Sequence, residues 1–151
     1  MEKFKWTTKG LCQAAAIAAL YAVLTIALQP ISFGANGAMQ LRVSEALTLL
    51  PVVTPTAVPG LFVGCLAANL LCGAPLPDII FGSLATLLAA IATRRLRKNV
   101  YLAALAPVIS NGVIVGIMLS VVYAVPLLWS CFTVAVGEVA ACYVLGIPLL
   151  K

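Results

Sequence analysis

Four charged side chains interrupt the long apolar body of this chain, and they are the residues most able to do chemistry: Arg42, Glu45, Asp78 and Glu138. Arg42 and Glu45 lie three residues apart in LRVSEALTLLP, so a helix would place them on about the same face. Glu138 lies in the apolar run TVAVGEVAACYVLG, where a charge costs about 2.5–3.5 kcal/mol on insertion scales measured for Arg, Lys and Asp. Because carboxylates accept paired N–H bonds strongly, we expect a polar site for a flat, nitrogen-rich ligand.

Amide side chains and one polar segment extend this expected site. Asn69 and Asn111 each offer two donors and one acceptor, although both could equally hold neighbouring helices together. The glycine-bearing segment 29–42 is too polar to span a membrane. We expect this segment to act as a lid, with Phe33 stacking on the ligand and Gln40 hydrogen-bonding to it.

Two of the acidic residues also have structural interpretations. Asp78 is placed to cap the helix expected after it, which would explain its presence without a ligand. Glu138 could form a buried pair with Arg42 or hold a proton, and a proton-coupled carrier that uses Glu138 also remains open.

Enzymatic and metal chemistry fit the sequence poorly. The chain has no histidine, which removes Ser-His-Asp triads and the HExxH zinc sites. Its single aspartate excludes an aspartyl dyad, and neither G-x-S-x-G nor G-x-x-x-x-G-K-[ST] occurs. We therefore expect a protein that is not an enzyme, with no catalytic residue, no cofactor and no metal site.

The composition is that of a membrane protein. Of 151 residues, 64% are hydrophobic and 9% charged, against about 25% charged in soluble domains. A bilayer span takes about 20 apolar residues, so we expect one all-α domain, residues 1–151, built as a six-helix transmembrane bundle. The first apolar run is longer than a signal peptide needs, and we expect it to be retained. The expected spans are 11–28, 43–57, 57–73, 78–94, 100–122 and 127–149.

The positive charges indicate an orientation. With six spans and a cytoplasmic N-terminus, eight of the nine basic residues fall on the cytoplasmic side, as the positive-inside rule requires. Both termini would then be cytoplasmic, and the net charge of +5 would reflect topology rather than binding to nucleic acid. These eight residues are Lys3, Lys5, Lys9, Arg94, Arg95, Arg97, Lys98 and Lys151.

Small residues recur at four-residue spacing, which lets helices approach closely. Gly60 and Gly64 form one such face. Ala14, Ala18 and Ala22 form another, widened by the alanines beside them. These faces could pack inside the bundle, and the alanine face of the first helix could instead dock against another membrane subunit.

Several longer motifs resemble one known family. QLRVSEALTLLPVVTPTAVPGLFVGCLAANLL (40–71), DIIFGSLATLLAA (78–90), PVISNGVIVG (107–116) and VGE (136–138) are similar to the QueT family. Its members are substrate-binding S components of energy-coupling factor (ECF) transporters for queuosine precursors. The resemblance implies six helices with cytoplasmic termini in a bacterial cell membrane. It also implies an ECF module as partner, comprising a transmembrane coupling subunit and two cytoplasmic ATPase subunits.

The resemblance further implies a 7-deazaguanine cargo such as preQ1, preQ0 or queuine, with another vitamin-like molecule as the alternative. Glu138 and Glu45 would then accept hydrogen bonds from the donor edge of the base. The aminomethyl cation of preQ1 would make a second carboxylate useful. The nitrile of preQ0 would prefer a donor such as Asn111 or Arg42, and the sequence leaves this choice open.

Overall fold

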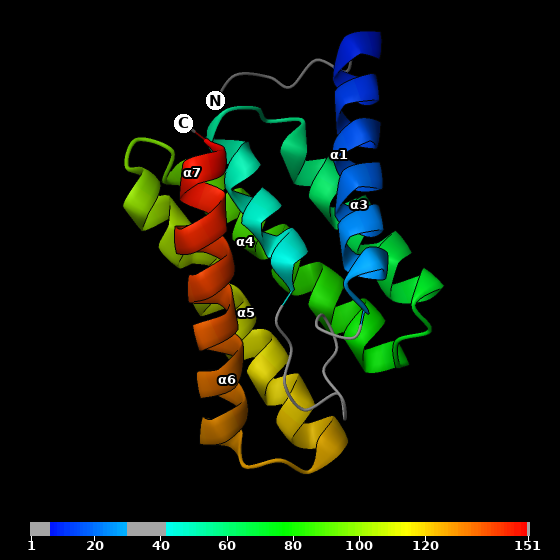
Figure 1. Cartoon of the computed structure of the whole chain (residues 1–151), viewed down its shortest axis with the longest axis vertical. Coiled ribbons are helices and arrows are strands. Elements are labelled where there is room, and N and C mark those ends of the chain that lie inside the picture. The colour runs from blue at the N-terminus through cyan, green and yellow to red at the C-terminus, as the bar shows by residue number, and fades with distance from the viewer. Residues whose placement is uncertain (1–6, 30–41, 151) are drawn as a thin grey trace.

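Every regular element in the computed structural model, which describes residues 7–29 and 42–150, is a helix (Figure 1). An all-α fold is therefore confirmed for this part of the chain. Phe33 and Gln40, expected in the lid, lie outside the described residues. The elements are α1 (Thr8–Ala27), η1 (Val43–Val52), α3 (Ala57–Leu71), η2 (Asp78–Gly82), α4 (Ser83–Arg95), α5 (Val100–Tyr123), α6 (Leu127–Val139), η3 (Ala140–Gly146) and α7 (Ile147–Leu149).

Among the described helices, three are long and apolar enough to cross a membrane: Thr8–Ala27, Val100–Tyr123 and Leu127–Leu149. The last of these runs without a break through α6, η3 and α7. α3 is apolar but has 15 residues, which at 1.5 Å per residue is less than a typical bilayer core.

The element expected over 43–57 differs most from its prediction. η1 is a 3₁₀ helix of ten residues that ends at Val52, whereas 3₁₀ runs beyond three or four residues are uncommon. Pro51 lies in its last turn, and Pro55 disfavours helical backbone at Thr54 before it. The element is therefore shorter than expected and separate from α3.

Glycines set the spacing between the helices. A Cβ on Gly60 would lie 2.7 Å from the carbonyl oxygen of Ala14, and one on Gly64 would lie 2.8 Å from that of Ala18. α1 and α3 therefore pack backbone against backbone. A Cβ on Gly116 would likewise lie 2.7 Å from the sulfur of Cys131, where α5 meets α6. The small-residue faces on α1, α3 and α5 are thus used for packing inside the bundle.

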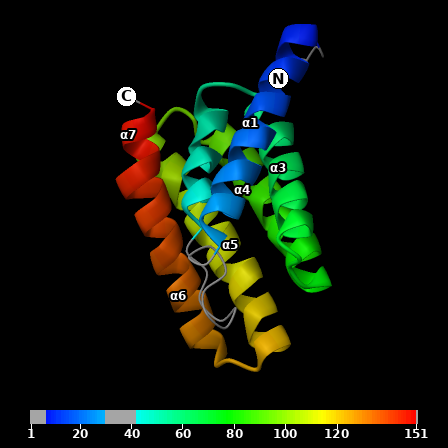
Figure 2. The ribbon, with the colours of Figure 1, turned by 45° about the vertical axis from the view of Figure 1, so that its right-hand side comes forward.

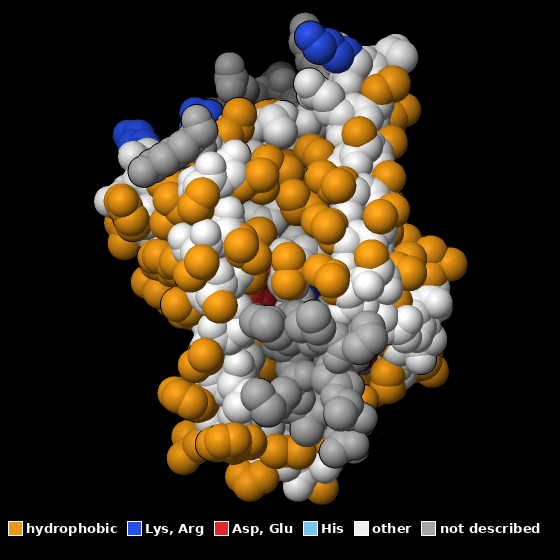
Figure 3. All heavy atoms as spheres, viewed as in Figure 1, with side chains coloured by type: hydrophobic (Ala, Val, Ile, Leu, Met, Phe, Trp, Pro, Cys, Tyr) orange, Lys and Arg blue, Asp and Glu red, His pale blue; other side chains and the backbone are white. Residues whose placement is uncertain are grey.

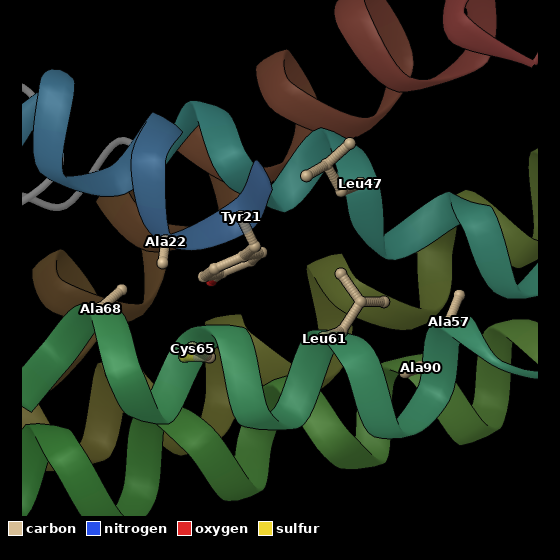
Figure 4. Packing of buried hydrophobic residues seen from close by; sticks show 8 residues of the cluster. All are labelled: Tyr21, Ala22, Leu47, Ala57, Leu61, Cys65, Ala68 and Ala90. Carbon is tan, nitrogen blue, oxygen red and sulfur yellow. The ribbon is translucent and has the colours of Figure 1, made fainter. Parts of the chain in front are cut away.

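The main apolar cluster joins α1, η1, α3 and α4. Tyr21 is fully buried within it, and its ring lies in the space between α1, η1 and α3 (Figure 4). The members of the cluster are Tyr21, Ala22, Leu47, Ala57, Leu61, Cys65, Ala68 and Ala90.

The outer surface is apolar along the helices and basic at one end. The start of α1, the turn between α4 and α5 and the end of α7 lie at the same end of the bundle (Figures 1 and 2). Most of the Lys and Arg side chains visible in Figure 3 gather at that end. Exposed basic residues there include Lys9, Arg95, Arg97 and Lys98.

Candidate functional site

A buried polar cluster lies where η1, α4, α5 and α6 meet. Glu45 is 1% exposed, and Glu138 and Arg42 are each 6% exposed. Burying such groups is costly unless they are hydrogen-bonded or paired, so the partners of each decide what the cluster can do. The described residues that line the cavity between them are Arg42, Glu45, Gly82, Thr86, Asn111, Val115, Val134 and Glu138.

Arg42 forms a buried ion pair with Asp78. One guanidinium nitrogen lies 2.7 Å from Asp78 Oδ1, and the other donates to Cys65 Sγ at 3.7 Å. A Cβ on Gly82 would lie 3.2 Å from Asp78 Oδ1 and 3.4 Å from Arg42. Gly82 therefore leaves the room that this pair occupies.

The capping role expected for Asp78 is wrong. A helical turn already begins at Leu76, so Asp78 lies inside the first turn, and its carboxylate faces Arg42 instead. Asn69 supports the same region, since its Nδ2 donates to the backbone carbonyl of Asp78 at 3.3 Å.

Glu45 takes its hydrogen bonds from two other helices. The Tyr21 hydroxyl on α1 and the Thr86 hydroxyl on α4 both donate to Glu45 Oε1, the latter at 3.1 Å. Glu45 Oε2 is buried and has no hydrogen-bond partner among the described residues. One oxygen of this carboxylate is thus fixed by the protein, and the other is available to a donor.

Glu138 is held by its neighbour on α5. Asn111 Nδ2 donates to Glu138 Oε1 at 2.8 Å, and the Cys142 thiol lies 3.8 Å from Oε2. Asn111 Oδ1 is buried without a partner in the described part of the chain. The carbonyl oxygen of this amide therefore remains as an acceptor for whatever else enters the cluster.

The structure brings together four of the residues expected from sequence: Glu45, Glu138, Asn111 and Arg42. Asn69 and Asp78 lie behind Arg42 rather than along the cavity.

Thr86 and Tyr21 also contact the carboxylates but were not expected. The spacing of Asp78, Gly82 and Thr86 at i, i+4 and i+8 could have indicated Thr86, because such residues share one helix face. Tyr21 is the one aromatic residue within 11–28, but its partner is on another element and nothing local indicates it.

The cavity is small. The space open to the centre of a water molecule is about 10 Å³, enough for about one water, whereas small-molecule pockets usually measure about 300–1,000 Å³. A bicyclic ligand can therefore enter this cluster only if the surrounding helices or side chains move apart.

The alanine face expected to dock against a partner is used inside the chain. Ala14 and Ala22 are buried, and Ala14 and Ala18 contact the glycines of α3 at backbone distance. A docking face must be accessible, so the face available on α1 is the adjacent one, which carries the exposed alanines Ala15, Ala16 and Ala19.

Comparison with known proteins agrees with the resemblance drawn from the motifs. Neither a curated protein nor a solved structure matches the chain. The family described as QueT transporter matches residues 11–151, which include every described residue of the buried polar cluster. The chain therefore belongs to the QueT transporter family.

Proposed function

We propose that this protein is the membrane-embedded substrate-binding component of an ECF-type importer for a queuosine precursor. The observation that carries the proposal is the pair of buried carboxylates, Glu45 and Glu138, inside the apolar bundle of a transporter-family protein. The cost of burying two carboxylates is hard to justify by packing alone. A bound cargo with several N–H donors would offset that cost.

A 7-deazaguanine has the groups that match this cluster. Its ring N–H and exocyclic NH₂ form an edge that gives two parallel hydrogen bonds to one carboxylate, the strong charge-assisted arrangement. The Asn111 carbonyl oxygen, which is buried without a partner in the described part of the chain, supplies a further acceptor. Apolar Val115 and Val134 flank these groups and could contact the faces of the ring.

Six membrane crossings with cytoplasmic termini are part of the same proposal. Three helices have the length for a crossing, and η1, α3 and the continuous helix Asp78–Arg95 would complete the six as shorter elements inside the bundle. The basic end of the molecule would then face the cytoplasm of a bacterial cell.

Coupling to ATP hydrolysis would be the work of partner subunits. Ala15, Ala16 and Ala19 give α1 an exposed face of small side chains, against which a helix of a transmembrane coupling subunit could approach closely. Two cytoplasmic ATPases attached to that subunit would supply the energy for release of the cargo inward.

Calorimetry on the purified protein in detergent tests the proposal, with preQ1, preQ0, queuine and guanine as titrants. We expect a deazaguanine to bind without ATP, and Glu138→Gln to weaken that binding by about tenfold or more, since hydrogen bonds to charged groups contribute about 1.5–3 kcal/mol. Ser120→Ala is the matched control, because its hydroxyl bonds to Val125 O, away from the cavity.

Absence of binding by all four compounds to a folded protein would refute the assignment of cargo. A carrier that uses Glu138 for proton coupling would behave differently again. Reconstituted alone in liposomes, it would accumulate cargo under a pH gradient, whereas the proposed binding component would need its partners.

A further inference from the structure

The form of η1 is not explained by its own sequence. Ten residues, Val43–Val52, adopt a 3₁₀ helix, although long runs of this form are uncommon because their hydrogen bonds are poorer. Pro51 disfavours an α-helix only in the last turn, where its ring would meet the carbonyl of Leu47. The residues before it include Glu, Ala and Leu, which favour an α-helix. Contacts with the rest of the protein must therefore hold η1 in this form.

The form of η1 decides where Glu45 points. A 3₁₀ helix turns by about 120° and rises by about 2.0 Å per residue, whereas an α-helix turns by about 100° and rises by about 1.5 Å. Over the six residues from Glu45 to Pro51, a change of form would move Glu45 by about 3 Å and rotate it by about 120° relative to the end of the element. Its carboxylate would then leave Tyr21 and Thr86, which donate to it in the structure.

The end of η1 lacks a backbone donor. The N–H of residue 55 would reach Pro51 O in an α-helix and Val52 O in a 3₁₀ helix. Residue 55 is a proline, which has no N–H. Arg94 on α4 supplies the missing donor, since its Nη1 lies 3.0 Å from Pro51 O and 3.2 Å from Val52 O. One guanidinium thus holds both carbonyls at the end of the element.

α4 holds η1 at two points, and their spacing fits the 3₁₀ form. Thr86 donates to Glu45, and Arg94 donates to Pro51. Thr86 and Arg94 are eight residues apart on α4, which is about 12 Å along its axis. Glu45 and Pro51 are six residues apart, which is about 12 Å in a 3₁₀ helix but about 9 Å in an α-helix. The two contacts therefore favour the 3₁₀ form over the α-helix.

Arg94 differs from the basic residues that follow it. It is half-buried, whereas Arg95, Arg97 and Lys98 are exposed. The end of α4 that carries Arg94 is fixed to α5, since Thr93 Oγ1 donates to a backbone carbonyl of α5 at 3.2 Å. The positive-inside rule explains why charge gathers at this end, but it does not explain why Arg94 points toward η1.

We infer that Arg94 is a positioning residue for the cargo site. It holds the end of η1, keeps this element in its 3₁₀ form and so keeps Glu45 in register with its donors on α1 and α4. The inference rests on the proposed function, because that function gives Glu45 a cargo to bind. It also connects the basic end of the molecule to a buried carboxylate about 12 Å away along η1.

Two assays on the purified protein in detergent test this role: calorimetry with preQ1, preQ0, queuine and guanine, and hydrogen exchange of η1 followed by mass spectrometry. Arg94→Met keeps the apolar stem of the side chain and removes its donors. It should weaken binding of the tightest compound by about tenfold and speed amide exchange in Val43–Val52 by a similar factor, since bonds from a charged group are lost. Arg94→Lys restores a cationic donor and should bring both values to within about threefold of the wild type. Arg95→Met removes the same charge from an exposed position and should change neither value.

A combination with Glu45→Gln separates positioning from a general effect on the fold. Substitutions more than about 10 Å apart normally have additive effects. If Arg94 acts through Glu45, Arg94→Met should weaken binding by less than about threefold once Glu45 is replaced. A general loosening of the fold would weaken binding by the same factor in both backgrounds.

The possible failures are distinguishable. Unchanged affinity in Arg94→Met would overturn the role of Arg94 and leave the proposed function standing. Full additivity with Glu45→Gln would overturn positioning through Glu45. If no compound bound the wild type, the proposed function would be refuted, and hydrogen exchange would still decide whether Arg94 holds η1. If Arg94→Met did not fold, Arg94→Gln and its control Arg95→Gln would decide the point in the same two assays.

Discussion

The contact between α1 and α3 gives a stability prediction whose size follows from the structure. In Gly64→Ala the new Cβ would lie 2.8 Å from Ala18 O, 2.9 Å from Ala18 Cα and 3.0 Å from Tyr21 Cβ. Carbon atoms in good contact are about 3.5–4.0 Å apart, so α1 must retreat by roughly 0.6 Å or more. Over-packing of this kind typically costs about 1–3 kcal/mol, and the better helix propensity of alanine offsets up to about 1 kcal/mol. We expect a net loss of about 1–2 kcal/mol.

Gly112→Ala is the matched control on α5. Its Cβ would lie 3.4 Å from the nearest atom, Ala135 Cβ, which is close to ordinary contact. The same chemical change should therefore be neutral there or stabilise the protein by up to about 1 kcal/mol through helix propensity. Both variants add one methyl group to an apolar helix, so the difference between them isolates the clash at α1.

Thermal unfolding in detergent, followed with a thiol-reactive dye, measures this difference. Cys65 and Cys142 are fully buried and would react when the bundle opens. The Gly64→Ala variant should unfold several degrees below Gly112→Ala, on the usual scale of about 2–4 °C per kcal/mol for a chain of this size. It should also bind cargo more weakly, because Tyr21 would move away from Glu45. Equal unfolding temperatures for the two variants would refute the packing argument.

Three other substitutions test the remaining contacts. Asp78→Asn leaves Arg42 buried without its carboxylate, which should cost about 3–5 kcal/mol of stability and lower the yield of folded protein in detergent. Replacing Arg42 and Asp78 together by apolar residues should restore much of that yield. Thr86→Val removes a donor to Glu45 and should weaken cargo binding by about tenfold in calorimetry, while Thr86→Ser should bind like the wild type. Ala19→Trp adds bulk to the exposed face of α1 and should abolish co-purification with the ECF module without changing cargo affinity; intact co-purification would exclude that face.

Sequence indicated four of the residues that meet in the buried polar cluster because each of them is expensive in an apolar chain. Glu138 and Asn111 interrupt long hydrophobic runs, so their presence alone indicated a use for them, and the structure places them 2.8 Å apart. The all-helical fold followed from composition by the same physics, since a chain this apolar must satisfy its backbone groups internally.

Sequence could not predict which charge pairs with which. A buried pair of Arg42 with Glu138 was one interpretation of the sequence, yet the ion pair of Arg42 is with Asp78, 36 residues away. The pairing depends on how η2 approaches Arg42 at the start of η1, and Gly82 permits it by leaving space beside the guanidinium. A tertiary contact of this kind cannot be predicted from the periodicity of any one segment.

The two sides of α1 connect the proposed partner to the proposed cargo. Ala15 and Ala19 face outward, while Tyr21 on the same helix points into the space between α1 and α3 (Figure 4) and donates a hydrogen bond to Glu45. Because α1 also packs against α3 at backbone distance through Gly64, a displacement of α1 cannot be absorbed by flexible side chains. A coupling subunit that shifts this helix would therefore pull directly on Glu45. Binding of a partner and affinity for cargo should accordingly be linked through Tyr21, and each should change the other by the same factor.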